Sequence, residues 1–413
     1  MAPTKKRSIA IRMYNVGFGD AFLLFFPTTK GIKKVLIDCG TIAKSEHSID
    51  EVAKKIIEDS TDGKNTLIDV VIATHRHRDH VSGFASSEWD EVEVREVWMP
   101  WTEDPLDPKA RHIRETQNRL ALQVSQQLQL KITRGGNVSH EEGLLELASN
   151  ALTNESAMQT LHQGFTGSPV RRFLPMRGAA NRTFTTDALP GVTIHALGPS
   201  RDESAIRNMD PPIGQSYLSQ SVSQQDGGKA LPPFPNIDEW KIEESSLPLS
   251  LKLSESDQKF VNTVGEGFED SVAVALDSAV NGTSLMLIFQ FGKATLLFPG
   301  DAQWGTWELA MKDPEWRGLL AKTTFYKVGH HGSHNATPVE YVDQLLKTGN
   351  ALWGAMASVK MIEKWPSIPR KPLLEKLGAQ AQHGLVRSDR LKDDVPSGFK
   401  KQGDLYVEAT IPV

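Results

Sequence analysis

Residues 74–80, THRHRDH, place three histidines and one aspartate within six positions of a 413-residue chain that has only 12 histidines. Histidines two positions apart in an extended turn point the same way, so His75 and His77 can bind one metal ion. Asp79 and His80 then project toward a neighbouring position. Imidazole and carboxylate ligands suit Zn²⁺, and also Mn²⁺ or Fe²⁺. Because four ligand-type side chains in one turn have no packing rationale, the stretch predicts a two-metal site.

The residues before this cluster predict how it is held. LIDVVIATH at 67–75 predicts a buried strand that delivers the cluster at its C-terminal end, where α/β proteins usually carry ligand loops. Three further strands are expected to end in matching chemistry, at Asp38 in LIDCG, Asp301 in LLFPGD and His330 in KVGHHGS. A carboxylate such as Asp301 can bridge two ions, and one such as Asp38 can accept the free N–H of a ligand histidine and fix its tautomer.

The pattern on either side is that of a mixed α/β protein. Residues 8–27 and 33–40 predict three strands, the first two joined by a tight turn, and 48–59 predicts a helix with Ser48 as its N-cap. Strands are also expected over 191–200, 283–301 (two), 324–333, 351–358 and 404–411, with helices over 112–132, 338–349 and 371–378. We interpret 1–413 as one domain that carries an insertion of helices and loops at 86–189 and a long Ser-, Gln- and Pro-rich loop, partly disordered, at 200–270.

Composition limits the classes of function. No apolar run approaches the roughly 20 residues that cross a bilayer, and the N-terminus lacks the apolar core of a signal peptide, so a cytoplasmic protein without a membrane partner is expected. The single cysteine, Cys39, excludes an internal disulfide framework and a cysteine-rich zinc site. A net charge of −5 gives no bulk attraction to nucleic acid, so any such contact needs local basic groups.

Together, Asp38, HRHRDH, PGD and HHGS occur in the order found in the metallo-β-lactamase fold hydrolases, which the chain resembles. It is most similar to the hydrolase domain at the end of the competence protein ComEC, through VGFGDA at 16–21, NGTSLMLIFQFGKATLLFPGDA at 281–302 and VGHHGSHNATP at 328–338. The resemblance covers 8–85 and 190–413 and leaves the insertion at 86–189 unexplained. It implies a four-layer αββα sandwich.

The resemblance also implies roles for the site residues. His75 and His77 would bind the first of two divalent ions, Zn²⁺ or Mn²⁺. Asp301 would bridge the two ions, and Asp79 would also orient a bridging water. The second ion would be held by Asp79, His80 and His330, with His331 either replacing His330 or acting as a proton donor. Asp38 and Ser333 would support these ligands from outside. None of the remaining histidines lies in a recognisable version of the motif that gives many fold members a third ligand to the first ion: His112, His140, His162 and His195.

A metal pair of this kind makes hydroxide available near neutral pH and points to a hydrolase. The resemblance favours a phosphodiesterase or nuclease acting on DNA, RNA or nucleotides, with substrate contacts from Arg76, Arg78, His334 and Asn335. The same ions could instead hydrolyse a small-molecule ester, thioester or lactam, and a non-catalytic binding protein of the same fold is the third hypothesis. A regulatory protein partner is compatible with a stand-alone nuclease. The oligomeric state is left open.

Overall fold

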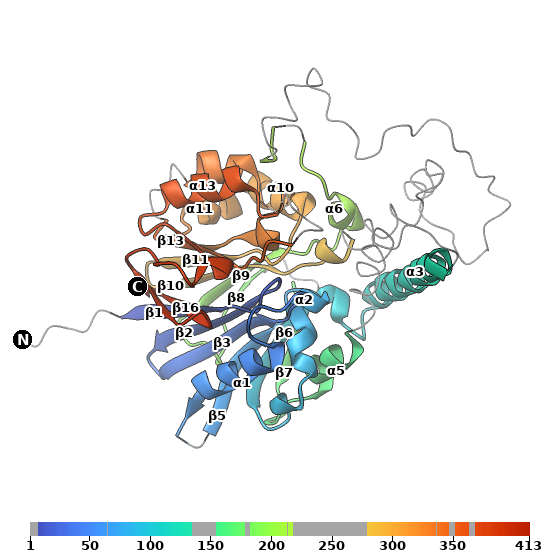
Figure 1. The fold of residues 1–413 in the computed structure, drawn as a ribbon, viewed down its shortest axis with the longest axis horizontal. Coiled ribbons are helices and arrows are strands. Elements are labelled where there is room, and N and C mark those ends of the chain that lie inside the picture. Colours follow the sequence, from blue (N-terminus) through green and yellow to red (C-terminus); the bar gives the residue numbers. More distant parts are fainter. Residues whose placement is uncertain are drawn as a thin grey trace, which may run out of the picture.

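Two β-sheets packed face to face form the body of the protein (Figure 1). The computed structural model describes residues 7–63, 65–133, 154–177, 182–212, 214–217, 279–335, 337–346, 352–362 and 368–413. Within these residues, nine strands form one sheet and seven form the other. The predicted mixed α/β class is therefore confirmed.

The larger sheet joins an antiparallel and a parallel part. Its antiparallel strands are β15 (Phe399–Gln402), β16 (Tyr406–Pro412), β1 (Ser8–Tyr14), β2 (Ala21–Thr28) and β3 (Gly31–Cys39), in that spatial order. The parallel part continues from β3 through β5 (Asn65–Ile72), β6 (Glu93–Pro100) and β7 (Val170–Leu174), while β4 (Thr61–Asp62) pairs with β5. The carboxyl ends of β3 and β5 thus lie side by side.

The smaller sheet has the same mixed character. Its parallel strands are β14 (Leu385–Arg387), β13 (Gly354–Ala357), β12 (Phe325–Lys327) and β11 (Ala294–Phe298). Its antiparallel strands are β10 (Met286–Phe291), β9 (Thr193–Gly198) and β8 (Thr183–Phe184). The parallel pairing of β11 with β12 brings the loop after Phe298 beside the loop after Lys327.

Three apolar clusters define four layers. One lies between the sheets and includes Phe26, Phe289 and Phe298. A second packs α10 (Trp304–Lys312), α11 (Pro314–Ala321) and α13 (Lys371–Gln380) on the outer face of the smaller sheet. A third packs α1 (Ile49–Asp59) and α5 (Glu155–Gln163) on the outer face of the larger sheet (Figure 1). Helix, sheet, sheet and helix therefore follow one another, with α3 (Pro108–Thr133) and α6 (Glu203–Arg207) to one side.

The expected elements around the histidine cluster are present. α1 begins after Ser48, whose side chain accepts from the Glu51 N–H while Glu51 accepts from the Ser48 N–H, so the predicted N-cap is a complete capping box.

His195 is buried between Thr183 Oγ1 and Gln290 Oε1, at 2.8 Å from each, which makes it a satisfied core histidine.

The structure corrects the prediction for residues 86–189, whereas most of residues 200–270 lie outside the described part of the chain. The 86–189 segment was expected to hold helices and loops, but β6 and β7 extend the larger sheet, because the Val- and Trp-rich run at 94–99 is buried against it. Most of the expected loop at 200–270 lies outside the described residues. Within the described part of the chain, every helix is too short or too polar to span a lipid bilayer.

Candidate metal centre

The histidine cluster follows β5 and enters the short helix α2 (Arg78–Val81). Its first residue, Thr74, is fastened to the end of β3: the Thr74 N–H and hydroxyl each donate to Asp38, at 2.7 Å. Asp38 has a φ of 58°, a left-handed conformation that turns its carboxylate toward the neighbouring strand. The two parallel strands are thereby joined at the point where the cluster begins.

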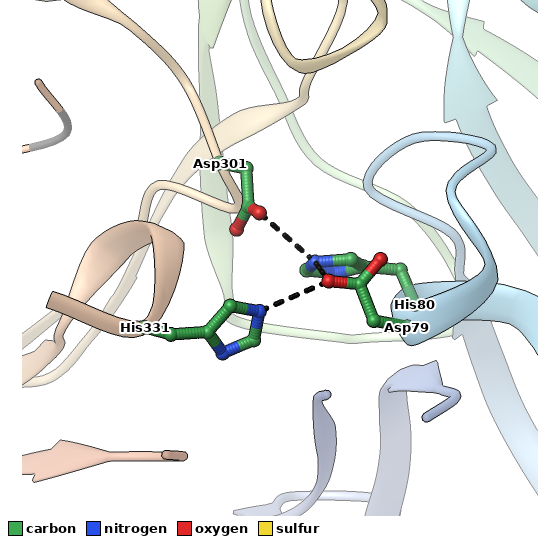
Figure 2. A group of neighbouring side chains, drawn as sticks. All are labelled: Asp79, His80, Asp301 and His331. Atoms are coloured by element: carbon green, nitrogen blue, oxygen red, sulfur yellow. Dashed lines mark hydrogen bonds and ion pairs between the residues drawn. The ribbon is translucent and has the colours of Figure 1, made fainter. Parts of the chain in front are cut away.

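Four side chains from three segments converge beside this loop (Figure 2). Asp79, His80, Asp301 and His331 each offer a ligand atom within 4.8 Å of the others, and all four are buried. Asp301 follows β11, and His331 lies in the 3₁₀ turn Gly329–Gly332 after β12. His80 Nε2 is 3.2 Å from Asp301 Oδ2, and His331 Nε2 is 3.1 Å from Asp79 Oδ2.

A second group shares Asp79. It contains His75, His77 and Asp79, so that this carboxylate belongs to both candidate ligand sets. His75 Nε2 lies 3.1 Å from His77 Nδ1. The pairing of His75 with His77, and of Asp79 with His80, therefore agrees with the arrangement predicted from the sequence.

The histidines share a pattern of hydrogen bonds that fixes which nitrogen faces the site. In each of four histidines Nδ1 contacts an oxygen of the protein: Thr74 Oγ1 for His75, Asn281 Oδ1 for His77, Asp38 Oδ2 for His80 and the Ser358 carbonyl for His331. Carboxylate and carbonyl oxygens only accept, so Nδ1 of His80 and His331 carries the proton. Nε2 of these rings then faces the carboxylates of the site, and it is the atom that would bind a metal ion in place of a proton, as in metal-bound histidines.

His330 differs from these four. Its Nδ1 is buried without a hydrogen-bond partner among the described residues, and its Nε2 lies 3.8 Å from Asp301 Oδ2 and 3.5 Å from Asn281 Nδ2. It also lies outside each group that could hold an ion. The prediction of His330 as the ligand of the second ion does not fit this geometry, whereas the alternative, His331, does.

Asp20 and Lys327 form a buried ion pair beneath the site, which the sequence analysis did not single out. Lys327 Nζ contacts Asp20 Oδ2 and lies 3.9 Å from Asp301 Oδ1. Asp20 Oδ2 is in turn 3.6 Å from His80 Nδ1. The position of Asp20 in VGFGDA was the available signal, since Gly19 just before it permits the close approach of the backbone to Asp79.

The electrostatics are those of a site with excess negative charge. Burial raises the pKa of Asp79, but His80 and His331 outweigh it and hold that pKa well below its usual range; His80 and His330 do the same for Asp301. Burial lowers the pKa of His80, yet the carboxylates of Asp301, Asp79 and Asp38 raise it well above its ordinary value. Protons on histidine thus supply part of the positive charge that the carboxylates require.

Burial also acts on the first histidine pair, where it outweighs the opposing effect of Asp79 and Asp301. It lowers the pKa of His77 to about 4 and that of His75 well below the ordinary value. Both rings are therefore neutral at pH 7, which is the form that binds metal.

The residues fit a metal pair. Asp79 Oδ1 and Asp301 Oδ1 are buried without a hydrogen-bond partner among the described residues. A buried carboxylate oxygen in this state is costly unless a cation occupies its free side. The donor set of imidazole and carboxylate suits Zn²⁺ or Mn²⁺.

The predicted substrate residues occupy different environments. Arg78 is exposed, but Arg76 Nε lies 3.4 Å from buried Glu103 Oε1, and its carbonyl accepts from Asn154 Nδ2 at 2.7 Å. Arg76 is therefore held by the 86–189 segment.

Three further predicted residues, Ser333, His334 and Asn335, lie in the loop after His331. Ser333 Oγ donates to Asn335 Oδ1 at 2.5 Å and both residues are buried, whereas His334 is partly exposed.

No family model and no curated protein matches this sequence. Function is therefore inferred from the residues of the site.

Proposed function

We propose that this chain is a binuclear metal-dependent hydrolase of the metallo-β-lactamase fold, and most specifically a phosphodiesterase or nuclease. The observation that carries the proposal is the orientation of four histidines, whose Nδ1 atoms all contact protein oxygens. Nε2 of His80 and of His331 thereby faces the carboxylates of Asp301 and Asp79. A core histidine such as His195 instead has both nitrogens bonded to neutral side chains, those of Thr183 and Gln290. The layered two-sheet architecture and the ComEC-like motifs support the same family.

In this proposal His75, His77 and Asp79 hold one ion, and Asp79, His80, Asp301 and His331 hold the other. Divalent ions bound there would lower the pKa of water to about 7 and offset negative charge developing on the substrate. Asp38 keeps His80 in the correct tautomer, and the Ser358 carbonyl does so for His331. Because the proton of His331 is engaged at Nδ1, we assign His331 as a ligand rather than as a proton donor.

Asp79 is the residue whose role is most directly testable. Its Oδ2 lies 3.1 Å from His331 Nε2, and its Oδ1 has no hydrogen-bond partner among the described residues, so this carboxylate can hold a cation and orient the attacking water. The expected cytoplasmic location and regulatory partner stay predictions.

The proposal is tested by incubating Zn²⁺- or Mn²⁺-loaded protein with single-stranded DNA, duplex DNA, RNA and cyclic nucleotides. Wild type is compared with Asp79→Asn and with Asp69→Asn. Asp69 is an equally buried aspartate, but it pairs with Lys33, away from the candidate ligands. We expect cleavage by wild type and Asp69→Asn and its loss in Asp79→Asn. If metal-loaded wild type leaves every substrate intact, the phosphodiesterase assignment is wrong, and ester, thioester and lactam substrates are the next to test.

A further inference from the structure

Arg370 is fixed against the loop that carries His331. Its backbone N–H donates to the Gly332 carbonyl at 2.9 Å. The preceding residue, Pro369, fills the space beside Gly332, where an added Cβ would meet it at 2.9 Å. Gly332 itself has a φ of 78°, which favours glycine. The position of Arg370 beside the metal loop is therefore set by close backbone packing on both sides.

The side chain of Arg370 lacks a polar partner among the described residues. It is partly buried, its Nε is inaccessible to solvent, and it forms no ion pair or side-chain hydrogen bond with any residue that the structure describes. Two other partly buried arginines are paired with a carboxylate, Arg172 with Glu96 and Arg317 with Glu340, and Arg171 donates to backbone carbonyls. Burial without such compensation lowers the pKa of Arg370. A guanidinium in this state carries a desolvation cost that an anionic ligand would offset.

The surroundings of Arg370 are basic on the side of the metal centre. Burial lowers the pKa of His334. The positive charge of Arg370 adds to this effect, Asp210 opposes it and His330 contributes less, so Arg370 and His330 both lie within electrostatic reach of His334. The nearest opposite charge to His334 is Asp210, whose Oδ1 is 4.0 Å from His334 Nε2 and whose side chain is 81% exposed. Solvent screens such a group, so it leaves the basic character of this edge in place.

We propose that Arg370, together with His334, forms an anion-binding subsite that holds a phosphate of the substrate next to the phosphate that reacts at the metal centre. This inference rests on the proposed phosphodiesterase function and narrows it to substrates with at least two phosphates, such as oligonucleotides. Arg370 is fixed beside Gly332, next to the His331 loop, so we assign it to a neighbouring phosphate rather than to the reacting one. The planar fork of a guanidinium matches a phosphate with two parallel hydrogen bonds.

Equilibrium binding to the metal-loaded protein tests this subsite. The probes are thymidine 3′,5′-bisphosphate and thymidine 5′-monophosphate, neither of which contains a phosphodiester bond. Wild type is compared with Arg370→Gln and with Lys371→Gln, a matched control that removes the same charge one residue away. The Lys371 side chain is 86% exposed and lies 3.6 Å from Glu375. Glutarate and butyrate, with two carboxylates and one, form a parallel arm that distinguishes a carboxylate ligand from a phosphate.

We expect wild type and Lys371→Gln to prefer the bisphosphate over the monophosphate. Arg370→Gln should reduce this preference by about 10- to 100-fold, the range for losing hydrogen bonds to a charged group. A preference that persists in Arg370→Gln, or that Lys371→Gln loses equally, overturns the subsite. A dependence on Arg370 seen only with glutarate overturns its assignment to phosphate. If the bisphosphate preference depends on Arg370 while no nucleic acid is cleaved, the subsite is supported and the proposed catalytic function fails separately.

Thermal unfolding separates this role from a structural one. Because the Arg370 side chain forms no polar contact within the described residues, Arg370→Gln should unfold at the wild-type temperature or above it. A clear loss of stability would mean that Arg370 supports the loop instead, and would overturn the proposal.

Discussion

Replacing Asp38 with asparagine should weaken metal binding without unfolding the protein. Asp38 is 1% exposed and accepts three hydrogen bonds, from the Thr74 N–H and hydroxyl at 2.7 Å and from His80 Nδ1 at 2.8 Å. Asparagine keeps the shape and tolerates the left-handed φ of 58° at this position. Its amide, however, offers one acceptor oxygen in place of two.

The substitution should change the tautomer of His80. If the asparagine oxygen keeps the Thr74 N–H, its NH₂ group faces His80 Nδ1 and favours the tautomer that has the proton on Nε2. That nitrogen is then no longer free for metal. Losing such an outer partner of a ligand histidine typically lowers metal affinity about 10- to 100-fold, or about 1.4 to 2.8 kcal/mol.

The assay is competition for Zn²⁺ against a chromophoric chelator, with circular dichroism as the check on folding. Asp69→Asn is the matched control, because Asp69 is 2% exposed, accepts from Lys33 Nζ at 3.0 Å and stands apart from the candidate ligands. It should lower thermal stability but leave zinc affinity unchanged. Wild-type zinc affinity in folded Asp38→Asn, or an equal loss in Asp69→Asn, would refute the reasoning.

Three further predictions concern single residues. His331→Ala should release one of the two ions, whereas His330→Ala should retain both, as measured by elemental analysis; equal losses would contradict the assignment of His331. Burial holds the pKa of His77 at about 4, below the value of about 6.5 in an unfolded chain. The unfolded state therefore binds the extra proton between these values, and the metal-free protein should lose up to about 3 kcal/mol of stability as the pH falls from 6.5 toward 4. Denaturant unfolding of the chelator-treated protein should show a smaller loss in His77→Gln. Glu103→Gln removes the anion beside Arg76, the residue between His75 and His77, and should therefore weaken zinc binding to these two histidines. The loss of zinc affinity should be smaller than in Asp38→Asn, and no loss would show that Glu103 does not help to position this loop.

The local pattern around residue 75 was predictable because its causes are local. Alternating apolar residues define β1, a buried run defines β5, and Ser48 caps α1. The spacing of His75 and His77 places them on one side of an extended turn. The resemblance to a known fold family supplied the expectation that Asp301 approaches the same place.

Other features depend on contacts that spacing does not reveal. His330 and His331 are adjacent, and both have a positive φ, at 43° and 49°, so no periodicity tells which one faces the carboxylates. The choice is made by the Ser358 carbonyl, which follows β13 and lies 27 residues away. Asn281, Lys327 and Arg370 likewise acquire their places only when distant segments pack together, and residue type alone does not mark them as site residues.

Metal stoichiometry tests the central claim most directly. Protein reconstituted with Zn²⁺ or Mn²⁺ and passed through a desalting column should retain about two ions per chain, and Asp79→Asn, which alters the carboxylate common to both ligand groups, should retain fewer. Folded wild-type protein that retains no divalent ion, or Asp79→Asn that retains as many as wild type, would contradict the proposed metal centre.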